Sequence, residues 1–226
     1  MTRQIEDLIV YEDQRREPLG ISGTGLPHPK DFGLNPIPMG TACWRGFYCE
    51  YTIRQNCFWL THLVVRQDGG YPLINGIQAL YEDAYILADD EDAPEPLLGR
   101  SLGTVVGSPD KSKIGHRQVE YDGGIYRGLN VSAPLTGGIL WGIDDIKVPY
   151  IQIHLNNLIS SSVILELLFE NGMLVKTVDH SAVMAAKREQ VLSLQRPEFQ
   201  SAEYALFEAN IKQWIRSTLT LDYKFL

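Results

Sequence analysis

The sequence predicts an α+β protein with a mostly antiparallel β-sheet built from hairpins, followed by two C-terminal helices. Two observations lead to this class. Asn171-Gly172 separates two strand-like runs, 163–170 and 173–178, and Asn-Gly between such runs is the strongest short-range hairpin signal. Strand-like segments also come first and helix-like segments last, an order typical of α+β proteins rather than of a doubly wound parallel sheet.

An earlier hairpin is predicted from Phe47–Arg54 and Cys57–Val65, joined at Gln55-Asn56, because Asn tolerates a positive φ in a two-residue turn. With regular pairing, the two faces of this hairpin differ in polarity. We expect the more apolar face to meet the core and the other to remain exposed. The first face would carry Cys49, Tyr51, Ile53, Phe58, Leu60 and His62, and the second Glu50, Thr52, Arg54, Trp59 and Thr61.

The remaining elements follow from local composition. Residues 12–38 are rich in Pro and Gly, which predicts a loop or an extended segment across the surface rather than a helix or a central strand. Helices are expected at 182–194, before Pro197, and at 198–218, where apolar residues recur at helical spacing. Further strands are expected at 5–11, 77–87, 102–106, 116–121, 125–129, 135–141 and 150–154.

The length of 226 residues suits one large domain or two small ones, and we expect a single domain over 1–226 with a helical part at 180–220. A shift of 116 positions superimposes the two hairpins and places Glu50 on Glu166. This match suggests duplicated hairpin units around 43–87 and 116–178. Two unrelated hairpins of similar length explain it equally well.

The chain has 28 acidic and 20 basic residues and a net charge of −8. This balance argues against nucleic-acid binding and suits a basic partner. No apolar stretch is long enough to cross a bilayer, and residues 1–9 lack the apolar region of a signal peptide, so we expect a cytoplasmic protein with no membrane association. The odd number of cysteines, Cys43, Cys49 and Cys57, agrees with reduced thiols.

No catalytic residue, cofactor or metal site is predicted. Gly20–Gly25 lacks the following helix of a phosphate-binding loop, and Asp89–Asp92 lacks the EF-hand pattern. Asp179-His180-Ser181 has the residue types of a hydrolase triad, but adjacent residues cannot form one, so capping of the next helix is the better explanation. The five histidines lack helical zinc spacing. The alternative for His62 is a thiolate–imidazole pair with Cys49 across the first hairpin.

Two aromatic-Arg-Gly triplets, Trp44-Arg45-Gly46 and Tyr126-Arg127-Gly128, indicate a recognition surface, because Arg stacks on aromatic rings and binds carboxylates. A structural cation–π contact at a strand end is the alternative. Together with the polar face of the first hairpin, the triplets define the predicted binding residues, which are Trp44, Arg45, Glu50, Arg54, Trp59, Tyr126 and Arg127.

Three segments carry a resemblance to known proteins. They are 43–47 (Cys-Trp-Arg-Gly-Phe), 136–142 (Thr-Gly-Gly-Ile-Leu-Trp-Gly) and the hairpin at 165–174. The chain resembles uncharacterised bacterial proteins of similar size. The resemblance implies no activity and no functional residue.

The leading hypothesis is a non-enzymatic protein-binding module, and its most concrete form is a bacterial immunity or antitoxin-type inhibitor. An acidic chain without a catalytic constellation motivates it, because such inhibitors neutralise basic toxins through charge complementarity. The alternative is an enzyme or small-ligand-binding protein with a dispersed site, in which Glu50 or Glu166 is the acid–base group. A structural subunit, including a homo-oligomer, is the third hypothesis.

Overall fold

The computed structural model describes residues 4–81, 123–146, 158–194, 197–198 and 200–225. It confirms the α+β class and the mostly antiparallel pairing. The chain divides into two compact units, a first unit of Met1–Glu17 and Leu26–Ala133 and a second unit of Pro18–Gly25 and Pro134–Leu226. The single domain over 1–226 stays a prediction, because two compact units can belong to one domain or to two.

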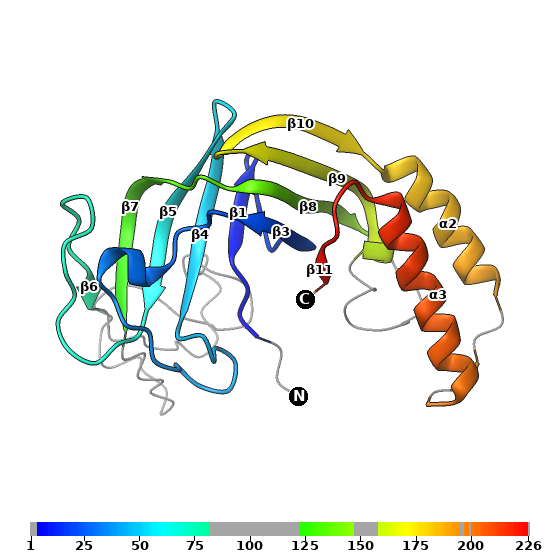
Figure 1. The fold of residues 1–226 in the computed structure, drawn as a ribbon, viewed down its shortest axis with the longest axis horizontal. Coiled ribbons are helices and arrows are strands. Elements are labelled where there is room, and N and C mark those ends of the chain that lie inside the picture. The colour runs from blue at the N-terminus through cyan, green and yellow to red at the C-terminus, as the bar shows by residue number, and fades with distance from the viewer. Residues whose placement is uncertain (1–3, 82–122, 147–157, 195–196, 199, 226) are drawn as a thin grey trace, which may run out of the picture. The chain divides into compact units, whose positions relative to one another are not determined.

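The first unit is built on one sheet with the strand order β2, β1, β4, β5, β7, β6. All pairs are antiparallel except β1 with β4, which is parallel. Figure 1 shows β4, β5 and β7 side by side. The short 3-10 helix η1 (Pro29–Phe32) lies in the loop before β4. The strands are β1 (Leu8–Tyr11), β2 (Gln14–Arg16), β4 (Phe47–Arg54), β5 (Cys57–Val65), β6 (Leu80–Tyr81) and β7 (Gly124–Ser132).

The hairpin β4–β5 has the predicted bounds, and its turn residues Gln55 and Asn56 have φ values of 51° and 61°. The prediction that His62 shares a face with Cys49 is wrong. β5 contains a bulge at Thr61, so Glu50 pairs with His62 and Cys49 pairs with Leu63. A single extra residue in a strand moves the side chains of all following residues to the opposite face, because side chains alternate between the two faces with a period of two. His62 therefore lies on the face of Glu50, not opposite Cys49.

The apolar face of this sheet forms a core of the first unit. Tyr51 stacks on Phe58 with ring centroids 4.9 Å apart, and Leu60, Leu63 and Tyr126 are fully buried beside them. Apolar burial of this kind stabilises a fold by about 25 cal/mol per Å² of area removed from water. We call the other face, which carries Glu50, Thr52, Arg54, Trp59, His62 and Arg127, the polar face of the first sheet.

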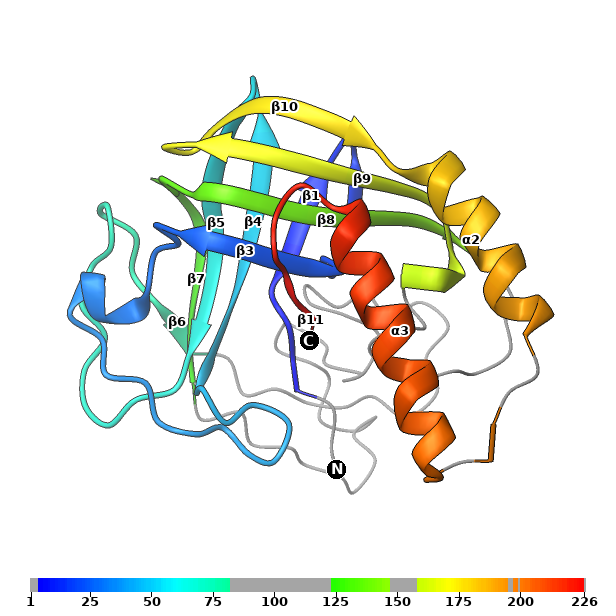
Figure 2. The same cartoon turned by 45° about the vertical axis from the view of Figure 1, so that its right-hand side comes forward.

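The strands of the second unit pair antiparallel in the order β11, β3, β8, β9, β10 (Figure 2). The second predicted hairpin is confirmed as β9–β10, with Asn171 and Gly172 at φ values of 47° and 77°. The strands are β3 (Gly20–Thr24), β8 (Thr136–Asp145), β9 (Ser161–Glu170), β10 (Met173–Asp179) and β11 (Lys224–Phe225).

Strand β3 overturns the prediction of a loop over 12–38. The glycine-rich segment pairs with β8 along its whole length and with β11 at its start. Its glycines serve close packing, because a Cβ atom on Gly23 would come within 2.7 Å of the Gly137 Cα in β8. Glycine weakens a strand locally but allows two backbones to approach, and the partner strand is more than 100 residues away in the sequence.

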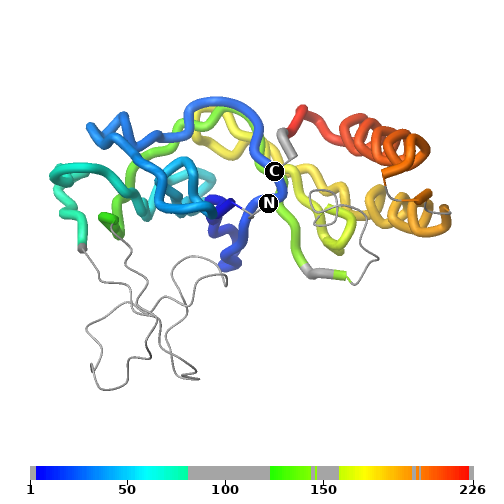
Figure 3. The backbone as a smooth tube through the Cα atoms, turned by 90° about the horizontal axis from the view of Figure 1, so that it is seen from below, coloured from blue at the N-terminus to red at the C-terminus, as the bar shows by residue number. Residues whose placement is uncertain are grey.

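Both predicted helices are present. α2 (Ser181–Ser193) and α3 (Ala202–Thr218) run side by side in Figure 3. α3 begins four residues later than predicted, where the Ser201 side chain accepts a hydrogen bond from the Tyr204 backbone N–H. The helices pack with β8 and β9 around a cluster that includes Leu140, Ile164, Met184, Val191, Ile211, Ile215 and Tyr223.

Apolar residues occur on both strands of the second hairpin, but β9 is mostly buried or half-buried whereas β10 is mostly exposed. Met173 and Val175 of β10 are each 51% exposed, because apolar character alone does not decide which strand the helices cover. The predicted strands at 102–106, 116–121 and 150–154, most of 77–87, and Asp89–Asp92 lie outside the described residues. Within the described ranges, neither α2 nor α3 is long and apolar enough to cross a membrane.

Candidate functional site

The seven predicted binding residues fall into three places in the first unit. Glu50, Arg54, Trp59 and Arg127 lie on the polar face of the first sheet. Trp44 and Arg45 belong to the loop before β4. Tyr126 points to the opposite, apolar face, where it is fully buried and its hydroxyl donates to the Pro72 carbonyl at 2.7 Å.

Glu50 is the centre of the polar face. It is 7% exposed, and its two carboxylate oxygens accept hydrogen bonds from Arg15 Nε at 2.7 Å and from His62 Nδ1 at 3.0 Å. Burial opposes ionisation of this carboxyl, but the hydrogen bonds and charges of His62 and Arg15 outweigh it and lower the pKa of Glu50. Glu50 is therefore an ionised anchor that holds an imidazole and a guanidinium.

The bulge residue Thr61 adds to this cluster. Its hydroxyl donates to the Glu50 backbone carbonyl at 3.0 Å and lies 3.3 Å from His62 Nδ1. On the other side of His62, β7 places Arg127 as its cross-strand neighbour. Cross-strand neighbours lie within about 5.5 Å at Cβ, so Glu50, His62 and Arg127 form one row over three strands.

Nearer the turn, Arg54 lies over the Trp59 ring at 5.0 Å and donates to the Asn130 side chain at 2.7 Å. This cation–π contact fixes both side chains on the polar face. Structure thus brings together four of the predicted residues, and it adds Arg15, Thr61 and His62 to them.

The second place is the loop of residues 40–46, which we call the Trp44 loop. The side chain of Gln4 bridges two points of this loop. Its amide NH₂ donates to the Thr41 carbonyl at 2.9 Å, and its amide oxygen accepts from the Trp44 N–H at 3.0 Å. The loop also closes on itself through Cys43 N–H to Gly40 O and Gly46 N–H to Cys43 O. Trp44 nevertheless remains 64% exposed.

Arg45 is anchored beside Trp44. Its guanidinium donates to both carboxylate oxygens of Asp7, at 2.7 and 3.2 Å, and lies 4.9 Å from the centroid of the Phe47 ring. Asp7 in turn accepts from the Cys49 backbone N–H at 2.6 Å. The structural interpretation of the Trp-Arg-Gly triplet applies to Arg45, which fixes the loop from which Trp44 projects, and the binding interpretation stays a prediction.

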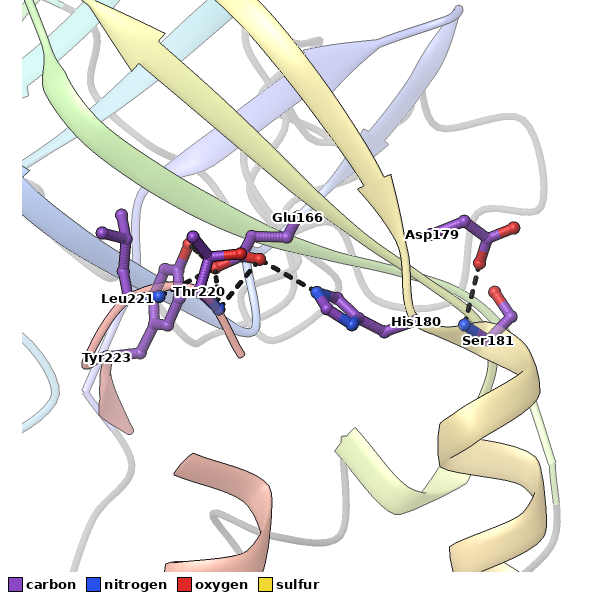
Figure 4. A network of polar contacts seen from close by, with 7 residues as sticks. All are labelled: Glu166, Asp179, His180, Ser181, Thr220, Leu221 and Tyr223. Carbon is purple, nitrogen blue, oxygen red and sulfur yellow. Dashed lines mark hydrogen bonds and ion pairs between the residues drawn. The ribbon is translucent and has the colours of Figure 1, made fainter. Parts of the chain in front are cut away.

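The second unit contains a buried network around Glu166 of β9 (Figure 4). Glu166 is fully buried and accepts hydrogen bonds from the Thr220 and Leu221 backbone N–H groups, at 3.0 and 3.2 Å, and from the Tyr223 hydroxyl at 3.0 Å. His180 Nε2 lies 2.9 Å from the other oxygen. The carboxylate ties β9 to the start of α2 and to the segment after α3.

Burial opposes ionisation of Glu166, but these donors outweigh it and lower its pKa, while burial and the facing carboxylate raise the pKa of Tyr223. Every direction around the carboxylate is occupied, so this network stabilises the fold and offers no room for substrate. Asp179 accepts from the Ser181 backbone N–H at 2.8 Å, and His180 turns towards Glu166, so the three residues do not form a triad.

The thiols are free, and burial raises the pKa values of Cys43 and Cys49. In the described part of the chain, no three His, Cys, Asp or Glu side chains are grouped so that they could hold a metal ion. Sequence reasoning missed Asp7, Arg15 and Tyr223, because each reaches its partner from a distant segment and belongs to no local motif.

Comparison of the chain with family models, with curated proteins and with solved structures found no match.

Proposed function

We propose that the chain is a non-enzymatic protein-binding module that engages its partner through the Trp44 loop. The observation that carries the proposal is a tryptophan held 64% exposed by a loop whose backbone is hydrogen-bonded on both sides. Trp is one of the residue types enriched at binding hot spots, so an indole that is both fixed and exposed suits the centre of a binding surface. A preorganised loop loses little entropy on binding.

The most concrete form of the proposal is a cytoplasmic immunity or antitoxin-type inhibitor of bacterial origin with a basic partner. The net charge of −8 supports this form, because charge complementarity speeds association and selects partners of opposite charge. A basic toxin bound in this way would dissociate more readily as the salt concentration rises.

The experiment compares the wild-type chain with Trp44→Ala and with a matched control, Leu206→Ala. Leu206 lies on α3 and is 66% exposed, so its substitution removes a similarly exposed apolar side chain from the second unit. Each tagged chain is expressed in its native cell, and the cross-linked proteins are quantified by mass spectrometry.

We expect one basic protein to be enriched by the wild type and by Leu206→Ala and to be lost with Trp44→Ala. The purified pair should then lose at least about tenfold in affinity on Trp44→Ala, as expected for removal of a hot-spot side chain. Equal enrichment by all three chains would overturn the proposal, and an acidic partner would overturn its inhibitor form.

A second candidate function is the binding of a small ligand, or an enzyme activity, at a dispersed site on the first sheet. The row of Glu50, His62 and Arg127 favours it, because an ionised carboxylate orients an imidazole beside a guanidinium. This candidate uses other residues than the Trp44 loop, so the two can be tested separately.

A further inference from the structure

The segment after α3, residues 219–225, is attached to the sheet through the Glu166 carboxylate of β9 (Figure 4). The Thr220 and Leu221 backbone N–H groups and the Tyr223 hydroxyl all donate to its Oε1, at 3.0, 3.2 and 3.0 Å. We call residues 219–225 the strap. Three polar groups of the strap therefore share one acceptor oxygen, and the strength of these hydrogen bonds depends on whether that carboxyl is ionised.

The strap has further polar contacts, which are short or exposed. β11 pairs with β3 over two residues, Lys224 and Phe225, and the Ser22 hydroxyl donates to the Asp222 carbonyl at 2.7 Å. The ion pair of Arg216 with Asp222 joins side chains that are 59% and 80% exposed, so it contributes little to stability. By contrast, β8 and β9 pair along most of their length. A segment with so few contacts opens at a lower free energy than a long strand pair.

Two glycines form the seat of Tyr223. A Cβ atom on Gly138 of β8 would lie 2.2 Å from the Tyr223 hydroxyl oxygen, and one on Gly20 of β3 would lie 3.4 Å from the Tyr223 Cβ. Glycine inside a strand often marks the close approach of another segment. The tyrosine is thus buried where both strands lack a side chain, and the hydroxyl at the end of its ring reaches the Glu166 carboxylate.

The protonation state of Glu166 decides how strongly the strap is held. Burial opposes ionisation, but hydrogen bonds from Thr220, His180 and Tyr223 outweigh it and lower the pKa of this carboxyl. The docked strap therefore favours the ionised carboxylate, and by linkage protonation of the carboxyl favours release of the strap. The stabilisation is fully present above the ordinary glutamate value and is lost as the pH falls through the lowered value of the folded protein.

Two titratable side chains face Glu166 in the described part of the chain. His180 Nε2, at the start of α2, lies 2.9 Å from Oε2 and carries a proton towards a carboxylate whether the ring is neutral or charged. The Tyr223 hydroxyl stays protonated, because burial and the carboxylate raise its pKa. The cross-strand neighbours of Glu166 on β8 and β10 are the apolar Leu140 and Val178. Titration of Glu166 itself is therefore what changes the contacts of the strap in acid.

We propose that Glu166 is a pH-sensitive switch, and that protonation of this one carboxyl releases the strap while β8 and β9 stay paired. Release uncovers the glycine seat of Tyr223 and the edge of β3 that β11 covers at Gly20 and Ile21. The inference concerns the second unit alone and is independent of the function proposed for the Trp44 loop.

The test is amide hydrogen exchange of the full chain, followed by NMR at a series of pH values from about 7 to about 3, which spans the titration of a carboxyl group. Each exchange rate is compared with the intrinsic rate of an unfolded chain at the same pH, which gives a protection factor. We expect the protection factors of the Thr220 and Leu221 amides to fall at least about tenfold in acid, because their charged acceptor is lost. The amides paired between β8 and β9 should keep their protection within about twofold, since these strands do not open.

Two variants assign the effect to Glu166. Glu166→Gln removes the charge and keeps the size of the side chain. At neutral pH it should already show the low protection of Thr220 and Leu221 that the wild type shows only in acid, and this protection should no longer depend on pH. Glu170→Gln is the matched control, since Glu170 is an exposed residue at the end of the same strand, and it should exchange like the wild type.

The inference is overturned if Thr220 and Leu221 keep their protection over the whole pH range. It is also overturned if the strap and the β8–β9 pair lose protection at the same pH, because the second unit then unfolds as a whole. Wild-type protection of the strap in Glu166→Gln at neutral pH has the same consequence. Because the wild-type titration decides between release and unfolding by itself, the test does not depend on the folding of Glu166→Gln.

Discussion

At the scale of single residues, the Glu166 carboxylate is the centre of a buried hydrogen-bond network. It receives hydrogen bonds from the segment after α3 and from His180 at the start of α2, with no exposure to solvent. An ionised carboxylate without such donors would be very costly to bury. The network therefore makes the position of the C-terminal segment dependent on one side chain of β9.

Tyr223→Phe should lower the free energy of unfolding by about 1.5–3 kcal/mol, because its hydroxyl donates to a charged acceptor. Tyr126→Phe is the matched control. Its buried hydroxyl donates to a neutral carbonyl, so the loss should be only about 0.5–1.5 kcal/mol. Urea denaturation of both variants measures the difference, and equal losses would contradict the charged character of Glu166.

The sequence identifies functional candidates where the residues belong to a recognisable local motif. Trp44 and Arg45 are predicted as a pair, and they do form one loop. No local motif predicts the ion-pair partners of Arg45 and Glu50. Asp7 is 38 positions from Arg45, and Arg15 is 35 positions from Glu50, so only the pairing of β1 with β4 brings them together.

At the scale of elements, the two hairpins are the best-predicted features. Their turns depend on two residues each, and the positive φ values at Gln55-Asn56 and Asn171-Gly172 follow from local preference. The bulge at Thr61 has no comparable signal, because nothing in Leu60-Thr61-His62 disfavours regular pairing. The match between Glu50 and Glu166 extends to a histidine partner for each, although a true duplication stays a prediction.

Gly46→Ala tests the rigidity of the Trp44 loop. Gly46 has a φ of 72°, and a Cβ atom there would lie 2.1 Å from the Ile37 carbonyl oxygen, so the loop must move. We expect a loss of stability greater than about 1 kcal/mol and a changed fluorescence of Trp44.

Gly33→Ala is the control for this substitution. Gly33 has a similar φ of 77°, but no atom lies within 4 Å of the added Cβ. Gly33→Ala should lower the free energy of unfolding only by the left-handed backbone strain of about 1 kcal/mol, and it should leave the Trp44 fluorescence unchanged. The same fluorescence change in both variants would contradict a specific role of Gly46 in the loop.

At the scale of the whole molecule, the pH dependence of stability follows from the shifted groups. The pKa values of Glu50 and Glu166 are lowered in the folded protein, so their contribution is present above the ordinary glutamate value and is lost as the pH falls through the folded values. The pKa values of Cys49, Tyr51 and Tyr223 are raised, so their contribution is present below the ordinary values and is lost as the pH rises.

We therefore expect a plateau of stability between about pH 5 and 8, with a decline on both sides. Urea denaturation at a series of pH values measures it. Glu166→Gln should reduce the overall stability by about 3 kcal/mol and make the acid decline shallower, because one ionised buried carboxylate is removed. An acid decline of unchanged steepness in this variant would contradict the assignment.

The sequence by itself determined the α+β class, both hairpins with their turns, the two C-terminal helices and the segment that carries Trp44. These features depend on residues close together in the chain, where backbone preference and side-chain periodicity act directly. Tertiary structure alone decided that 20–24 is a strand, that His62 faces Glu50, that β10 is exposed, and that Glu166 receives the C-terminal segment. Each of these features depends on partners that are distant in the sequence. Residues that form a long-range hydrogen bond or ion pair belong to no common local motif, so the local sequence does not reveal the pair.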